Sequence, residues 1–404
     1  MADSPQLQQV TADELKSKFI RACELQEAGA IYNALAIHNE ILPFIPESPL
    51  IHFNMGLAHF EIGDFDRAAE HYQTACKGNP DDPDIHYNQG LNFRRLGKLH
   101  DAVKSFTKAE ELGDSSVDTL YNRALCYQDL KELSNAAKLY DEILQKERTH
   151  QPALNNYAYL CHKAGEIEKA KQLYERLLEL NPQDTAAQHM LNALCGVTPD
   201  NAPLEYVESV FDAYAGKFEE NLLKDLQYRT PMELWRLFKK LFPKRHNCNC
   251  LDLGCGTGLA GEAFHSVCSE LTGVDISGKI LQKAKAKKRY KRLVKDDIVS
   301  YLENTEEDYD LLLAADVFTY MGELKPLFRA CYQQCKREGI LCFSVEESGG
   351  NSFYLKETGR FGHSHSYITK ACENAGWKLL VSEHSKLRQD KKQWIYGYLF
   401  LFQK

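Results

Sequence analysis

The spacing of apolar positions along this 404-residue chain changes close to residue 200. In the first half, apolar and small residues recur at the intervals of amphipathic helices, and the pattern itself returns every 34 residues. After Cys250, short apolar runs of strand length alternate with amphipathic stretches of helix length. This change of period predicts an all-helical array followed by an α/β domain with a mostly parallel sheet.

The first half contains five copies of the 34-residue pattern in register, without an insertion. One position holds alanine in every copy: Ala34, Ala68, Ala102, Ala136 and Ala170. A position four residues later holds a ring: His38, Tyr72, Phe106, Tyr140 and Tyr174. We expect the small residues to bring two helices close together and the rings to fill the gap between repeats. The pattern resembles the tetratricopeptide repeat over roughly residues 15–184, which implies a superhelix closed by a capping helix at 184–194.

A ladder of asparagines runs through four consecutive repeats: Asn54, Asn88, Asn122 and Asn156. In tetratricopeptide proteins this position faces the concave groove, and an amide offers both a donor and an acceptor to a peptide backbone. The alternative is that the asparagines only stabilise helix packing. Because asparagine is a poor helix former, we favour a protein or peptide partner in the groove.

Residues 196–203 interrupt the helical pattern with Pro199, Pro203 and the Asp200–Asn201 pair. We therefore expect a flexible N-terminus at 1–14, the five repeats with their capping helix at 15–197, a linker at 198–203 and the second domain at 204–404. Apolar residues at helical spacing predict that this domain begins with a helical lid over 204–242, with its second helix after Pro231.

Strand candidates in the second domain lie at 250–254, 271–275, 292–296, 310–315, 339–345, 376–384 and 393–402. The last two are separated by the polar turn 389–392 with no helix between them, so they must pair antiparallel. We therefore predict a doubly wound, Rossmann-like sheet of seven strands whose last strand is antiparallel.

A glycine-rich turn follows the first of these strands. Residues 251–253 lead into Gly254, Gly256 and Gly258, and the next strand ends in Asp275. Glycine adopts positive φ freely and leaves room for a ligand against bare backbone. At this edge of a parallel sheet, the pattern predicts a nucleoside-cofactor site in which Asp275 accepts the two ribose hydroxyls.

Two cofactor classes fit such a turn. Residues 256–261 satisfy the G-x-G-x-x-G pattern of dinucleotide sites, with Asp275 as the ribose carboxylate. That alternative leaves Asp252 and Gly254 unexplained, whereas Asp-x-Gly-x-Gly-x-Gly resembles motif I of the class I S-adenosylmethionine-dependent methyltransferases. The resemblance implies S-adenosylmethionine as cofactor, held by the turn around Cys255, with Asp252 facing the amino end of its methionine.

The ends of the later strands supply further cofactor contacts. In the methyltransferase pattern Asp297 receives the adenine amino group, and the backbone of Ile298 reaches a ring nitrogen; Asp296 remains an alternative to Asp297. Ile276 follows the ribose carboxylate and would pack on the adenine face.

Three candidates lie closer to the reaction. Asp316 and Tyr320 follow the fourth strand, and by topology this loop lies beside the transferable methyl group, so either could contact methionine or substrate. His363 follows the fifth strand, and a histidine side chain ordinarily titrates close to neutral pH, which suits a substrate contact or a base. His365 is nearby, but no third ligand accompanies the two histidines, so we expect no metal.

Charge and composition narrow the partners. Residues 1–200 carry 19 Lys+Arg against 30 Asp+Glu, a balance of −11, and residues 201–404 carry 30 against 27, which together give −8. An acidic first half argues against nucleic acid, and we interpret the nine basic residues from Lys279 to Lys295 as a solvated helix surface. The cysteines are scattered without a framework spacing, which predicts free thiols. Because we find neither a secretion signal nor an apolar run of membrane length, we expect a cytoplasmic protein without a membrane span.

The whole chain resembles predicted methyltransferases that carry an N-terminal tetratricopeptide array, and its catalytic half is also similar to enzymes that methylate a malonyl-thioester carboxylate. The segments that carry the resemblance are the motif I block, 206–215, 226–231, 316–322 and 359–364. It implies an unassigned substrate and a lid formed by Phe211 to Tyr214 over the cofactor.

Two functions remain open from the sequence. The first is an active methyltransferase whose repeats recruit a protein partner or substrate. The second is a repeat scaffold whose methyltransferase fold binds cofactor only structurally. The three intact carboxylates Asp252, Asp275 and Asp297 favour the first, since a silent site has no physical reason to keep them.

Overall fold

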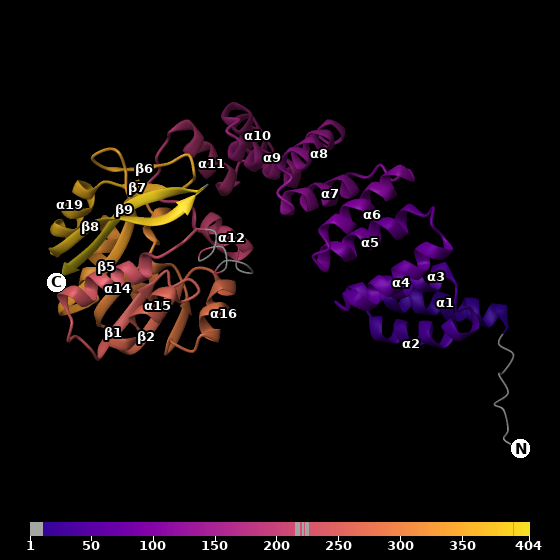
Figure 1. The fold of residues 1–404 in the computed structure, drawn as a ribbon, viewed down its shortest axis with the longest axis horizontal. Coiled ribbons are helices and arrows are strands. Elements are labelled where there is room, and N and C mark those ends of the chain that lie inside the picture. The colour runs from indigo at the N-terminus through magenta and orange to yellow at the C-terminus, as the bar shows by residue number, and fades with distance from the viewer. Residues whose placement is uncertain (1–10, 215–218, 220–221, 223–225, 391) are drawn as a thin grey trace, which may run out of the picture. The chain divides into compact units, whose positions relative to one another are not determined.

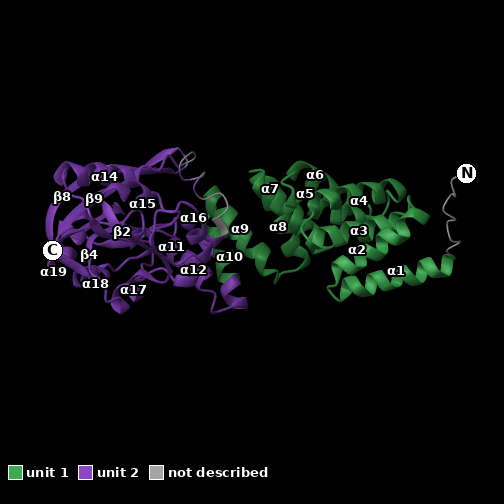
Figure 2. Cartoon of the chain, turned by 90° about the horizontal axis from the view of Figure 1, so that it is seen from below, with its two compact units in different colours: residues 1–176 green, residues 177–404 purple. Residues whose placement is uncertain are grey.

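The computed structural model describes residues 11–214, 219, 222, 226–390 and 392–404. The chain divides into two compact units, residues 1–176 and residues 177–404, which Figure 2 shows in different colours. Among the described residues, no helix has both the length and the apolar character that a membrane span requires.

Antiparallel helix pairs build the first unit (Figure 1). The described residues form five pairs: α1 (Ala12–Glu27) and α2 (Ile31–Ile41), α3 (Pro49–Glu61) and α4 (Phe65–Gly78), α5 (Pro83–Arg95) and α6 (Leu99–Glu111), α7 (Val117–Asp129) and α8 (Leu133–Lys146), α9 (Gln151–Ala164) and α10 (Ile167–Leu180). A one-turn 3-10 helix, η1 (Leu42–Phe44), follows α2. The helical array that the 34-residue period predicts is therefore confirmed.

Close helix contact within each repeat depends on its small residues. The alanine shared by all five copies is fully buried in each of them. A β-carbon added to Gly56 would lie 2.6 Å from a ring carbon of Tyr72, and one added to Gly90 would lie 2.7 Å from a ring carbon of Phe106. The ring therefore lies between the two helices of its own repeat, rather than only between repeats as the pattern suggested.

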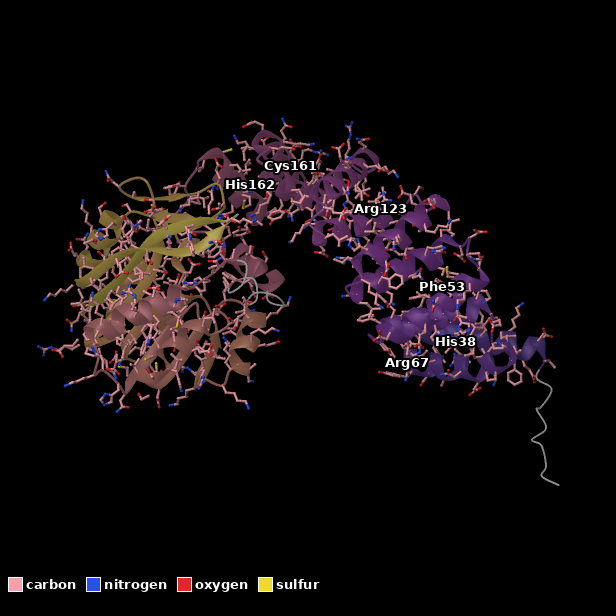
Figure 3. The ribbon with its side chains drawn as sticks, viewed as in Figure 1. His38, Phe53, Arg67, Arg123, Cys161 and His162 are labelled. Atoms are coloured by element: carbon pink, nitrogen blue, oxygen red, sulfur yellow. The ribbon has the colours of Figure 1, made fainter. Side chains whose placement is uncertain are left out.

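Four histidines gather in the first two repeats. The Nδ1 atoms of His52 and His71 are 2.9 Å apart, His59 stacks on His71 with ring centroids 5.3 Å apart, and His38 is fully buried. Figure 3 labels His38 and Arg67 in this part of the array. Burial, with the neighbouring histidines and Arg67, lowers the pKa of His71 to about 4.

We expect the first unit to lose stability in mild acid. The pKa of His71 lies near 4 in the folded chain and at an ordinary 6.5 when unfolded, so the unfolded chain binds more protons between these values. The contribution of neutral His71 to the free energy of unfolding is fully present above about pH 6.5 and decreases as the pH falls toward 4. Thermal unfolding at pH 7.5 and pH 5.0 measures the difference, which His71→Gln should reduce and His100→Gln, on the exposed face of α6, should not. An identical pH dependence in His71→Gln would contradict this account.

A seven-stranded sheet forms the centre of the second unit (Figure 1). Its strands are β1 (Cys248–Leu253), β2 (Cys268–Asp275), β3 (Arg292–Lys295), β4 (Tyr309–Ala314), β5 (Cys335–Glu346), β8 (Lys378–Asp390) and β9 (Gln393–Gln403). The order is β3-β2-β1-β4-β5-β9-β8, with β1 to β5 parallel and β9 antiparallel to both of its neighbours. The predicted antiparallel pairing of the last two strands is confirmed.

Helices cover both faces of this sheet. On one face, Phe238 of α14 (Thr230–Leu241) and Phe264 of α15 (Leu259–Phe264) share a buried cluster with strand residues. The other face is covered by α17 (Ile298–Asn304), α18 (Lys325–Gln333) and α19 (His365–Asn374). Each of these helices contributes a residue to a second buried cluster with strand residues: Leu302, Phe328 and Ile368, respectively. The other helices in the described part of this unit are α11 (Thr185–Cys195), α12 (Leu204–Tyr214), η3 (His265–Val267), α16 (Gly278–Ala286) and η4 (Phe318–Tyr320).

Two features near the sheet differ from the sequence-based description. A small hairpin of β6 (Phe353–Leu355) and β7 (Phe361–His363) was not predicted. The segment predicted as a linker, 198–203, is ordered, because the Asp200 carbonyl accepts hydrogen bonds from the N–H groups of Gly322 (2.9 Å) and Glu323 (2.7 Å). The capping helix α11 also belongs to the second unit, where His189 Nε2 lies 2.9 Å from the Gly359 carbonyl oxygen.

Candidate functional site

The glycine-rich turn lies between β1 and α15 in the conformation that its residues predict. Gly254, Gly256 and Gly258 have φ values of 60°, 55° and 91°, a region that side chains with a β-carbon adopt at a cost. A β-carbon at Gly254 would lie 2.7 Å from a methyl group of Val317. At Gly256 it would meet none of the described atoms within 4 Å, so this backbone is open to a ligand.

Asp275 joins the end of β2 to the turn. One carboxylate oxygen accepts a hydrogen bond from the backbone N–H of Gly256 at 2.8 Å, and the other accepts one from the N–H of Ser277 at 2.9 Å. Burial raises the pKa of this carboxyl above its ordinary value, against these bonds. Each oxygen keeps a second lone pair, so Asp275 has acceptor capacity for a ribose as well.

Asp252 lies at the end of β1 with only 1% of its surface exposed. Burial raises its pKa to about 7, and the Tyr290 hydroxyl donates a 2.6 Å hydrogen bond to its Oδ2. The Tyr290 ring also lies under the turn, since β-carbons added to Gly258, Gly261 or Gly273 would each approach it within 3 Å. Sequence reasoning missed Tyr290, whose only signal was an aromatic residue in a basic stretch.

The other predicted cofactor residues lie along the same edge of the sheet. Asp297 is the N-cap of α17, where its Oδ1 accepts from the N–H groups of Val299 and Ser300, and Ile298 is buried behind it. Asp296 Oδ1 accepts from the N–H of Asp297 at 2.8 Å. Both adenine alternatives therefore remain predictions.

Two further predicted cofactor residues lie near Asp275. Ile276, next to Asp275, is half-buried. Cys255 is buried in the turn, and its N–H donates to the Val274 carbonyl at 2.9 Å.

Helix α12 is bonded to residues at or next to the ends of β2 and β3. Asp212 accepts a 2.5 Å hydrogen bond from the Ser277 hydroxyl, and Glu208 pairs with Lys295 at 2.7 Å. Phe211 packs edge-on against Tyr320, with ring centroids 5.2 Å apart. The lid itself stays a prediction, and the side chain of Tyr214 lies outside the described residues.

Charged side chains from several segments meet near the ends of β4 and β5. We call them the buried ion network: Asp316, Glu346, Lys356, Arg360 and Arg388. Arg388 is 1% exposed, donates to both oxygens of Asp316 at 2.6 Å and pairs with Glu346. Asp316 has a φ of 62°, a strained value for a residue with a side chain. Of this network, sequence reasoning identified only Asp316.

His363 and Tyr320 occupy different environments. The His363 ring is fully buried, and its Nε2 lies 3.0 Å from the Gly322 carbonyl oxygen, so Nε2 carries the proton and Nδ1 is the basic atom. Burial lowers its pKa to about 4. Tyr320 is half-buried between Phe211 and Arg360. Catalytic roles for both stay predictions.

His365, the second histidine of the pair, points elsewhere. Its Nε2 lies 2.8 Å from the Ser382 hydroxyl, whereas His363 binds the loop after β4. In the described part of the chain, no group of three or more His, Cys, Asp or Glu side chains is arranged to hold a metal ion.

We expect Gly322→Ala to destabilise the loop that carries Tyr320. A β-carbon there would lie 2.6 Å from the Asp200 carbonyl oxygen and 2.8 Å from a ring carbon of Phe361. Overpacking of this kind costs about 1–3 kcal/mol. Thermal unfolding measures the loss, and Gly349→Ala is the matched control, since its β-carbon would meet none of the described atoms within 4 Å. Equal melting temperatures for the two variants would contradict the close contact.

Comparisons with known proteins find repeat models in the first half of the chain and a methyltransferase model in the second half. A family model described as a methyltransferase domain matches residues 251–343, and three models described as tetratricopeptide repeats match 56–93, 87–152 and 127–195. A ubiquinone biosynthesis O-methyltransferase from Escherichia coli is 25% identical over 203 residues, which cover 45% of this chain and 81% of that protein. A malonyl-[acyl-carrier protein] O-methyltransferase from Bacillus cereus is 26% identical over 125 residues, 30% of this chain and 46% of that protein.

Among solved structures, magnesium protoporphyrin IX methyltransferase from Synechocystis with bound S-adenosylmethionine covers 50% of this chain and 96% of its own, with 14% identity and a TM-score of 0.40. The methyltransferase match, 251–343, contains the glycine-rich turn, Asp275 and the end of β4. The chain therefore matches tetratricopeptide-repeat models in its first half and a methyltransferase-domain model in its second half, and it is similar to O-methyltransferases.

Proposed function

We propose that the second unit is a class I methyltransferase that uses S-adenosylmethionine. The observation that supports this most is the open glycine-rich turn after β1, with Asp275 at the end of the adjacent strand and hydrogen-bonded to the turn. A carboxylate at that position suits two ribose hydroxyls, and Asp252 one strand away suits an ammonium group. The dinucleotide alternative leaves Asp252 without a role.

Each of these residues would have its own role in binding the cofactor. Backbone at Gly254 and Gly256 receives the cofactor, Asp275 orients its ribose, and α12 excludes water from the site through its bonds to Ser277 and Lys295. When bound, the cofactor supplies a methyl group activated on a sulfonium, so alignment of the acceptor supplies much of the rate. A base is needed only if the acceptor is protonated, and Nδ1 of His363 is the atom that would serve.

Calorimetric titration of the full chain with S-adenosylhomocysteine and with NAD tests the cofactor. We expect the nucleoside thioether to bind and NAD not to bind; tight NAD binding would refute the assignment. Transfer of tritium from methyl-labelled cofactor into size-fractionated lysate then tests activity. Cofactor binding without any transfer would favour the silent scaffold, which the O-methyltransferase relatives do not favour.

For the first unit we propose recognition of a protein partner through the asparagine ladder. All four side chains are half-buried, and Asn54, Asn88 and Asn122 each donate one amide hydrogen to the carbonyl four residues earlier. Arg94 donates to the Asn122 oxygen at 3.0 Å, so this arginine also contacts the ladder. Each of these amides retains a second N–H for a ligand.

We expect Asn88→Ala combined with Asn122→Ala to abolish partner capture while cofactor affinity stays unchanged. Each lost side chain removes hydrogen bonds to peptide backbone, worth about 1 kcal/mol apiece. Pull-down with the parent, the double variant and the control Asn135→Ala, which is exposed on α8 and pairs with Glu132, measures the effect. A double variant that melts far below the parent would show that the ladder serves packing.

A further inference from the structure

The buried ion network carries an excess of positive charge. It contains the cations Lys356, Arg360 and Arg388 and the carboxylates Asp316 and Glu346, three positive charges against two negative ones. Charges removed from water are costly unless they are paired. One positive charge in this group therefore lacks a full counterion within the network.

Hydrogen-bond distances identify which cation that is. Arg388 spans both carboxylates, and Lys356 Nζ lies 2.9 Å from Glu346 Oε2, so these two cations account for the acidic oxygens. Arg360 Nη1 lies 3.9 Å from Glu346 Oε1, beyond hydrogen-bond distance. Its guanidinium keeps donors that this carboxylate does not occupy, and a third of its side chain (33%) is exposed.

The position of Arg360 connects it to the reacting side of the site. Its guanidinium carbon lies 5.9 Å from the centre of the Tyr320 ring, and the same ring packs against Phe211 of α12. Tyr320 follows β4, where the topology of a doubly wound sheet places ligands. A ligand that reaches the end of β4 beside α12 therefore meets an aromatic ring and an arginine whose charge is only partly compensated.

We propose that the methyl acceptor carries an anionic group, a carboxylate or a phosphate, and that Arg360 binds it. This inference rests on the proposed methyltransferase function and adds the chemical class of the substrate. The planar guanidinium matches either anion with two parallel hydrogen bonds. Arg388 and Lys356 occupy the oxygens of the two protein carboxylates, so Arg360 makes only a 3.9 Å ion pair with Glu346 and a side-chain hydrogen bond to Tyr320, which leaves further guanidinium donors for a ligand.

Calorimetric titration of the full chain saturated with S-adenosylhomocysteine tests the proposal, with succinate, inorganic phosphate and the neutral analogue succinamide as probes. We expect at least one anion to bind, and succinamide to bind at least about tenfold more weakly. Comparison of succinate with phosphate distinguishes the two anion classes. Arg360→Gln should weaken the anion by about 10–100-fold, the range for hydrogen bonds to a charged group.

Two further variants keep the outcome interpretable. Arg360→Lys retains the positive charge and should recover part of the anion affinity. Such a recovery would show that Arg360→Gln loses affinity because it loses the charge and not because it misfolds. Arg236→Gln, an exposed arginine of α14 that pairs with Glu233, should bind the anion like the parent. Equal anion binding by parent and Arg360→Gln, or no anion binding by the cofactor-loaded parent, overturns the proposal. Failure of the parent to bind S-adenosylhomocysteine at all refutes the proposed function instead.

Discussion

Asp275→Ala should lower the affinity for S-adenosylhomocysteine by two to three orders of magnitude. The variant loses two charge-assisted hydrogen bonds to the ribose, worth about 2–4 kcal/mol together. It also loses the bond from the Gly256 N–H, which fixes the turn against the end of β2. The loss therefore acts on the ligand and on the shape of its site, which is why we expect a large effect.

Asp275→Asn separates the loss of the ribose hydrogen bonds from the loss of the bond to the turn only in part. Both carboxylate oxygens accept from backbone N–H groups, of Gly256 and Ser277, and an amide nitrogen would present hydrogens to one of them. We therefore expect Asn to be nearly as damaging as Ala. Asp308→Ala, an exposed residue before β4, is the matched control and should bind like the parent. Calorimetry that finds parent-like affinity in Asp275→Ala would remove the basis of the cofactor assignment.

The sequence predicts those parts of the fold that depend on local periodicity. The alanine that recurs every 34 residues is buried in each repeat because its side chain lies where two helices touch. The glycine-rich turn is equally local, since positive φ at Gly254, Gly256 and Gly258 is a property of the backbone at those residues. Pairing of β9 with β8 follows from a turn too short for a helix.

Contacts between distant segments are what the sequence does not reveal. Arg388 lies 72 residues from Asp316 and 42 from Glu346, and nothing in the spacing of charged residues distinguishes it from its exposed neighbours. Tyr290 likewise reaches Asp252 over 38 residues. The 198–203 segment has the composition of a linker, yet the Asp200 carbonyl binds the loop after β4. The contact partner of each of these residues can be identified only when the fold is known.

Arg388→Met should produce the largest loss of stability in the second unit. Arg388 is the counterion of both Asp316 and Glu346, and its removal leaves two carboxylates in a site where Glu346 is 2% exposed. Breaking a buried ion pair by removing one partner costs about 3–5 kcal/mol. Thermal unfolding should show one transition lowered strongly in Arg388→Met and only slightly in Arg236→Met, whose ion pairs are half-exposed and worth about 0–1 kcal/mol.

The pH dependence of this loss gives a second, independent test. Burial would raise the pKa of Glu346, but Arg388, Lys356 and Arg360 outweigh it and hold the pKa at about 2, compared with an ordinary 4.5. A lowered carboxyl pKa adds stability that is present above about pH 4.5 and is lost as the pH falls toward 2. Without Arg388 the folded pKa of Glu346 should rise, so the melting temperature of Arg388→Met should depend less on pH between 4.5 and 2. A variant that melts like the parent and shows the same acid profile would mean that Lys356 and Arg360 alone compensate the carboxylates, and the central role of Arg388 would be wrong.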